Sequence, residues 1–126
     1  MSKILIADDS QDLLEIIKIT MEEQGYEICI TANKRDFKSA VKSFHPDLIL
    51  MDVFLNDADG RVICKDLKRN SRTKRIPVIM CSANPYALSN FHLYGANDAI
   101  DKPFTIDSLI KKIEHLLINP FLRKAS

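Results

Sequence analysis

Short apolar runs alternate along the chain with segments in which apolar residues recur every three or four positions. The first run, Lys3–Ala7, is followed by two acidic residues and predicts a strand buried on both faces of a sheet. Four further runs predict strands at residues 26–31, 48–51, 76–81 and 99–100.

Helical patterns follow the predicted strands, and residues typical of helix ends bound them. Ser10 is the expected N-cap of the first pattern, which Gly25 ends. The second pattern begins after Asn33 and ends at Pro46, and the third begins after Asp59-Gly60 and extends past Leu67. The fourth begins after Asn84-Pro85 and runs towards Gly95, and the fifth begins after Thr105 and ends at Asn119-Pro120.

Strands that alternate with helices across short turns predict a parallel sheet covered by helices on both faces, an α/β architecture. The sequence contains no linker, repeat or low-complexity tract, so we expect one domain. Ligands of such sheets bind beyond the carboxyl ends of the strands. Functional residues are therefore expected there.

Composition narrows the choice of function. The chain has 126 residues and a net charge of +1, which argues against binding of nucleic acid or of an anionic membrane through charge alone. Asp8 and Asp9 stand where a signal peptide would have its apolar stretch, and no apolar run could cross a bilayer, so we expect a cytoplasmic protein. Cys29, Cys64 and Cys81 are odd in number and widely spaced, which favours buried thiols over a disulfide or zinc site.

Polar residues with complementary chemistry stand at the predicted strand ends. They are Asp8 and Asp9 after the first strand, Asp52 after the third, Ser82 after the fourth and Lys102 after the fifth. Three adjacent carboxylates repel one another unless a cation lies among them. Mg²⁺ suits such a site, because it prefers oxygen ligands and keeps positions open for a phosphoryl oxygen. Asp52 is the candidate nucleophile for phosphoryl transfer.

The order and spacing of these residues, together with Asp59-Gly60 and the triplet Lys102-Pro103-Phe104, resemble the receiver domain of two-component response regulators. The resemblance implies a flavodoxin-like, doubly wound (βα)5 three-layer sandwich whose five-stranded parallel sheet has the order 2-1-3-4-5. We expect the receiver domain to occupy residues 1–119 and a short C-terminal tail to follow at 120–126.

The resemblance also implies how the acidic residues act. Asp52 would be the phosphoacceptor. It would bind Mg²⁺, or Mn²⁺ in its place, together with Asp8, Asp9 and the backbone carbonyl of Phe54.

Ser82 and Lys102 would contact the phosphoryl group, and the peptide bond before Pro103 would be cis, as in the family. Ala99 departs from the family pattern, because many receiver domains have an aromatic residue there whose rotation transmits phosphorylation. Phe54 is large for its position, and our hypothesis is that its ring screens the phosphoryl group from water.

Two surfaces could either bind a partner or be ordinary solvated and packed parts of the protein. Residues 61–75 carry seven Lys or Arg against one acid, Asp66. We favour a solvated face, because this segment should lie partly at the end of the sheet opposite the acidic residues. The helix expected at 85–95 has more large apolar residues than one face can bury, and Phe121 and Leu122 follow the last helix. The resemblance implies a partner surface on the fourth helix, fifth strand and fifth helix, and we expect some of these residues to be exposed there. We expect at least half of them to pack against the sheet instead.

The sequence predicts a stand-alone response regulator that is phosphorylated on Asp52 by a histidine kinase, a histidine phosphotransfer protein or a small phosphodonor. It would signal by protein contact or onward phosphotransfer, as a monomer or a phosphorylation-dependent dimer, and would not be a turnover enzyme. The main alternative is an interaction module of the same fold that accepts no phosphate. A flavin carrier is disfavoured because Asp8 and Asp9 would repel the flavin phosphate. A phosphohydrolase of the haloacid dehalogenase type is disfavoured because Ser10 stands where its second Asp would be.

Overall fold

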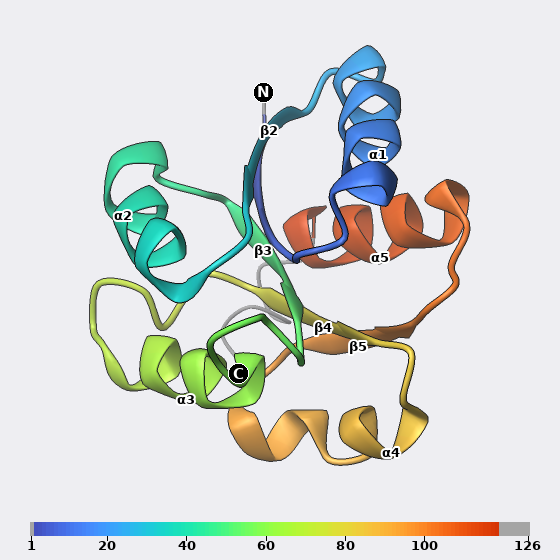
Figure 1. Cartoon of the computed structure of the whole chain (residues 1–126). Coiled ribbons are helices and arrows are strands. Elements are labelled where there is room, and N and C mark those ends of the chain that lie inside the picture. The colour runs from blue at the N-terminus through green and yellow to red at the C-terminus, as the bar shows by residue number, and fades with distance from the viewer. Residues whose placement is uncertain (1, 119–126) are drawn as a thin grey trace.

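The computed structural model describes residues 2–118, which form one five-stranded parallel sheet with helices on both faces (Figure 1). The strands are β1 (Lys3–Ala7), β2 (Glu27–Thr31), β3 (Leu48–Asp52), β4 (Val78–Ser82) and β5 (Asp98–Asp101). They lie in the order β2-β1-β3-β4-β5, and each neighbouring pair is parallel. The predicted flavodoxin-like fold is confirmed.

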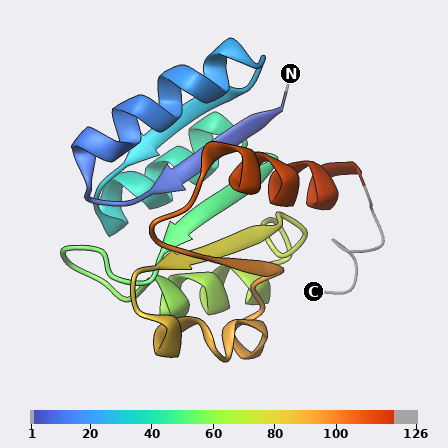
Figure 2. The same ribbon diagram turned by 90° about the vertical axis from the view of Figure 1, so that its right-hand side faces the viewer.

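Two layers of helices cover the sheet. They are α1 (Gln11–Glu23), α2 (Lys34–Phe44), α3 (Gly60–Arg69), α4 (Pro85–Leu88), the 3-10 helix η1 (Phe91–Tyr94) and α5 (Ile106–Ile118). Helices α1 and α5 pack on one face, whereas α2, α3 and α4 with η1 pack on the other (Figures 1 and 2). None of the described helices has the length and apolar character needed to span a bilayer.

Strand β1 contributes to two hydrophobic cores, because successive strand side chains point to opposite faces of the sheet. Leu5 and Ala7 belong to the core under α2 and α3. Ile4 and Ile6 belong to the core under α1 and α5, and all four side chains are fully buried. A slip of one residue would exchange the two cores, so the packing holds the register that aligns the strand ends.

The helices begin close to the predicted positions, but the predicted residues do not always cap them with their side chains. The Asn33 side chain caps α2 by accepting a hydrogen bond from the Asp36 amide. Ser10 makes no side-chain cap on α1; its own amide instead donates to the Asp8 carboxylate. Asp59, which the sequence places just before the third helix, is the N-cap of α3 and accepts from the Arg61 amide at 2.9 Å.

The predicted fourth helix is wrong in its length. It was expected to run towards Gly95, but α4 ends at Leu88 and the chain resumes as η1 after Ser89 and Asn90. The Ser89 hydroxyl donates to the Tyr86 carbonyl, and Asn90 leaves the helical region at φ −118° and ψ 35°. Short polar side chains compete for backbone hydrogen bonds in this way, which explains the break.

Strand boundaries moved by one or two residues from the prediction. The fourth strand was expected at 76–81 and occupies Val78–Ser82, and the fifth was expected at 99–100 and occupies Asp98–Asp101. Asp52 and Ser82 are therefore the last residues of their strands rather than the first residues beyond them. The predicted tail at 120–126 lies outside the described residues.

Candidate functional site

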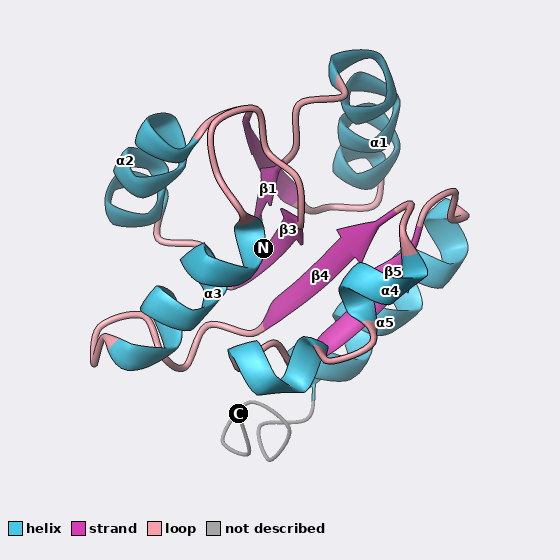
Figure 3. Ribbon diagram, turned by 60° about the horizontal axis from the view of Figure 1, so that its bottom comes forward, coloured by secondary structure: helices cyan, strands magenta, loops and turns pink. Residues whose placement is uncertain are grey.

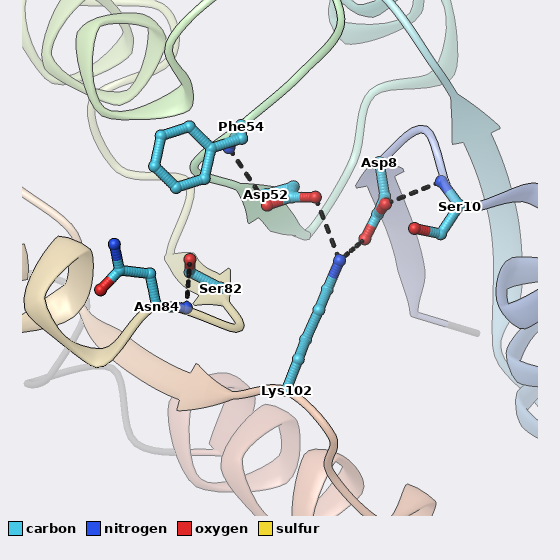
Figure 4. A network of polar contacts seen from close by, with 7 residues as sticks. All are labelled: Asp8, Ser10, Asp52, Phe54, Ser82, Asn84 and Lys102. Atoms are coloured by element: carbon cyan, nitrogen blue, oxygen red, sulfur yellow. Dashed lines mark hydrogen bonds and ion pairs between the residues drawn. The ribbon is translucent and has the colours of Figure 1, made fainter.

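The expected site residues come from four different strands and lie at one edge of the sheet (Figure 4). Asp8 and Asp9 follow β1, Asp52 ends β3, Ser82 ends β4 and Lys102 follows β5. These strands are parallel neighbours, so their carboxyl ends meet without any long connection through the protein.

The three acidic residues form one compact group. A carboxylate oxygen from each of Asp8, Asp9 and Asp52 lies within 4.8 Å of the others. Asp8 and Asp52 are buried, whereas Asp9 is partly exposed. The set contains only oxygen donors and no imidazole or thiolate, which is the ligand chemistry of Mg²⁺ rather than of zinc. These residues fit the expected metal.

Lys102 reaches across the sheet edge into this group. Its Nζ donates to Asp8 Oδ2 at 2.6 Å and to Asp52 Oδ2 at 3.0 Å. Burial disfavours the charge on Lys102, but the hydrogen bonds with Asp8 and Asp52 outweigh it and raise the pKa of the ammonium above its ordinary value. The side chain therefore stays charged and offsets part of the repulsion between the carboxylates.

Both oxygens of Asp52 are engaged. Oδ2 accepts from Lys102, and Oδ1 accepts from the Phe54 amide at 3.1 Å. Burial raises the pKa of the Asp52 carboxyl above its usual range, and the repulsive charge of Asp8 adds to this, while the Lys102 hydrogen bond lowers it. A carboxylate held in this way is oriented and only partly solvated, which favours its use as a nucleophile.

Ser82 and Phe54 lie at the border of this group. The buried Ser82 hydroxyl accepts from the Asn84 amide at 3.0 Å, so its described hydrogen bond holds the loop after β4 rather than an acidic residue. Phe54 is 53% exposed and lies beside Asp52 (Figure 4). The Lys102-Pro103 peptide bond is cis, as expected. Ala99 is partly buried in β5, and an aromatic switch at this position is absent.

Two residues next to the site, Gly60 and Asp57, were given no role in it from the sequence. A Cβ on Gly60 would overlap the backbone carbonyl oxygen of Asp52, so α3 can begin this close to the phosphoacceptor candidate only with glycine there. The Asp57 carboxylate accepts from the Lys34 amide at 3.2 Å and connects the loop after β3 to α2. In the sequence the Asp59-Gly60 pair marked the start of a helix and part of the family resemblance, but it gave no sign of this close approach to Asp52.

Comparisons with known proteins agree with this geometry. The family model of the response regulator receiver domain matches residues 4–114. Response regulator ArlR of Staphylococcus saprophyticus is 33% identical, with 93% of this chain and 53% of that protein covered. The chain spans about half the length of the curated relatives that it matches.

Solved structures extend the likeness to three dimensions. The receiver domain of a signal transduction histidine kinase from Syntrophus aciditrophicus is 32% identical, with a TM-score of 0.84 over 94% of this chain and 91% of that one. Chemotaxis protein CheY4 of Vibrio cholerae is 26% identical, with a TM-score of 0.84 over 93% and 99%. The chain belongs to the response regulator receiver domain family.

Proposed function

We propose that Asp52 accepts a phosphoryl group from a phosphohistidine of a histidine kinase or histidine phosphotransfer protein, with Mg²⁺ bound by Asp8, Asp9, Asp52 and the Phe54 carbonyl. The observation that carries this proposal is the convergence of three carboxylates and one ammonium at the carboxyl edge of the sheet. An acidic group that reaches the solvent at the partly exposed Asp9 and holds an oriented carboxylate, Asp52, is suited to phosphoryl transfer.

The chemistry requires one bond to form and one to break. An Asp52 carboxylate oxygen attacks phosphorus, the P–N bond to the donor imidazole breaks, and the imidazole takes up a proton as it leaves. Lys102, already 3.0 Å from Asp52, would turn its ammonium towards the transferred group, and Ser82 would donate its hydroxyl proton to another phosphoryl oxygen. Bound Mg²⁺ would neutralise charge on the phosphoryl oxygens.

Receiver domains are signalling modules and not turnover enzymes. For this chain, we propose that the phosphoryl charge biases the loops after β3, β4 and β5 between two arrangements and that another protein recognises the difference. Output through protein contact or onward phosphotransfer follows from this proposal. The Tyr86 and Leu93 side chains, 87% and 67% exposed beside β5, support a contact surface there.

Intact-protein mass after incubation with acetyl phosphate tests the phosphoacceptor. We expect one Mg²⁺-dependent, alkali-labile phosphoryl adduct on the wild type and on Asp12→Asn, a control that changes an exposed carboxylate in the first turn of α1. We expect no adduct on Asp52→Asn. An adduct that persists in Asp52→Asn would contradict the assignment of the phosphoacceptor. A wild type that binds Mg²⁺ but takes no phosphate would favour the phosphorylation-independent interaction module.

A further inference from the structure

A groove of about 940 Å³ lies between α2 and α3, which run next to each other on one face of the sheet (Figures 1 and 3). His45 and Pro46, before β3, and Thr73 and Ile76, before β4, line one end of it. The groove therefore opens at the amino ends of the strands. It is separate from the acidic group, which lies at their carboxyl ends.

The floor of this groove is apolar and is part of the packed core. Phe37 from α2 and Ile63 from α3 line it and are almost fully buried. Val41, Leu67 and Ile76 also line it and pack against the same core while remaining partly exposed. A partner would therefore meet a rigid surface made of apolar side chains, which requires little reorganisation on binding.

The rim of the groove is basic. Lys38, Lys42 and Arg72 line it with exposed side chains, against one acid, Asp66, among the described residues there. Within residues 2–118, the ion pairs do not involve the side chains of these three cations. Four further exposed cations belong to α3 and to the segment between α3 and β4, namely Lys65, Arg69, Lys74 and Arg75. The whole chain has a net charge of +1, whereas the residues that line the groove include three Lys or Arg and one acid.

We propose that the groove between α2 and α3 is a docking site for an acidic amphipathic helix of a partner protein. Such a helix would place its apolar stripe on Val41, Leu67 and Ile76 and its carboxylates against Lys38, Lys42 and Arg72. Charge complementarity would select an acidic partner and exclude basic ones. The phosphates of a nucleic acid would pair with the basic rim but would leave the apolar floor uncovered. A membrane surface is too broad to enter a groove between two helices.

A pair of designed peptides tests the proposal. The first has about 14 residues, roughly four helical turns, with Leu at i, i+3, i+4 and i+7 and Glu at most other positions. The second replaces each Glu with Lys. Fluorescence anisotropy should detect binding of the acidic peptide and much weaker binding of the basic one. Backbone amide shifts on α2, α3 and the loop at 70–77 should locate the bound peptide in the groove.

Two matched charge reversals test whether the peptide binds in the groove or is attracted only by the net charge of the protein. Lys42→Glu on α2 and Lys111→Glu on α5 change the net charge equally, and both lysines are exposed. We expect Lys42→Glu to weaken binding of the acidic peptide about fivefold or more and Lys111→Glu to leave it nearly unchanged. Equal effects of the two variants, equal binding of both peptides, or no binding below about 1 mM would overturn the proposal.

A second copy of this chain is the alternative to a different protein as the ligand of the groove. Helix α1 exposes Leu13, Ile16 and Ile19 and also carries acidic residues, so a second copy could in principle enter the groove. Sedimentation of the wild type and of Lys42→Glu at the peptide-binding concentrations decides this. We expect both to be monomeric. Self-association that Lys42→Glu abolishes would assign the groove to a second copy and overturn its assignment to a different protein.

Discussion

Lys102 is the residue on which the electrostatics of the site depends. Its ammonium contacts two carboxylates that are 5% and 8% exposed, and its own side chain is 16% exposed. Three carboxylates in one group would otherwise repel one another without compensation. Asp9 lies outside this ion-paired set but within the carboxylate group. Its carboxylate is therefore the one most free to respond to an added cation.

The Asp9→Ala variant tests the metal site. With Mg²⁺ at about ten times its Kd, binding to the folded wild type should add about 1.4 kcal/mol of stability. This corresponds to roughly 5 °C in Tm for a domain of this size. Asp9→Ala should lose this increase, whereas Asp12→Ala, which removes an exposed acid from the first turn of α1, should keep it. A Tm increase that survives in Asp9→Ala would remove Asp9 from the proposed site.

Phe54 is the second residue whose role can be tested, and the prediction rests on the proposed phosphorylation of Asp52. Its amide donates to Asp52 and its half-exposed ring stands beside the same carboxylate. If the ring hinders the approach of water, Phe54→Asn should shorten the lifetime of the phosphorylated protein roughly fivefold. The control Leu93→Asn changes an apolar side chain exposed on η1 and should leave the lifetime unchanged. The lifetime is measured by the decay of the phosphoryl adduct in intact-protein mass, and an unaltered decay in Phe54→Asn would refute the screening hypothesis.

At the scale of the element, strands were predicted better than the helix broken at Ser89 and Asn90. Every residue of β1 after Lys3 is apolar. A continuous apolar run of this kind is typical of a strand that is buried on both faces of a sheet. The break between α4 and η1 depends on one hydrogen bond from Ser89 to Tyr86 and on the backbone angles of Asn90. A single side-chain hydrogen bond does not change the spacing of apolar residues. The apolar pattern therefore continued across Ser89 and Asn90 and predicted one longer helix.

The connection between α3 and β4 depends on Lys68, whose Nζ donates to the Ile76 carbonyl at 2.7 Å and to Asn97 Oδ1 at 3.0 Å. Burial lowers the pKa of this ammonium, but these acceptors compensate for its desolvation. Lys68→Met retains the aliphatic stem and should cost about 1–2 kcal/mol in urea unfolding, because buried acceptors lose their donor. Lys65→Met, an exposed change on the same helix, should cost close to nothing. Equal stability of the two variants would mean that burying the ammonium costs as much as its hydrogen bonds contribute.

At the scale of the whole molecule, the acidic group could be predicted and the groove could not. Parallel topology brings every strand's carboxyl end to one edge, so Asp8, Asp52 and Lys102 could be placed together from their order in the sequence alone. The groove depends on the distance between α2 and α3 and on which basic side chains face it. Neither property has a sequence period. Residues 61–75 were interpreted as a solvated face because they were expected to lie partly at the end of the sheet opposite the acidic residues.

The loop after β3 connects these two ends of the molecule. Its residue Asp57 accepts from the Lys34 amide at the start of α2, and Asp59 caps α3, so both walls of the groove are attached to it. The same loop begins at Asp52, whose two oxygens each accept a hydrogen bond, from Phe54 and from Lys102. Addition of a phosphoryl group to either oxygen must rearrange at least one of these bonds and thereby disturb the loop.

We therefore expect phosphorylation to loosen the groove and to weaken binding of the acidic peptide about fivefold, the lower end of typical coupling between sites. Asp57→Ala should weaken binding without phosphate, because it removes the attachment of α2, and should reduce the further effect of phosphorylation. The measurement is peptide anisotropy before and after treatment with acetyl phosphate and Mg²⁺, with the adduct quantified by mass and Asp52→Asn as the control. A fully labelled protein with unchanged peptide affinity would refute the coupling while leaving both sites intact. An unlabelled protein would refute the phosphoacceptor assignment instead, because binding to the groove is measured without phosphate.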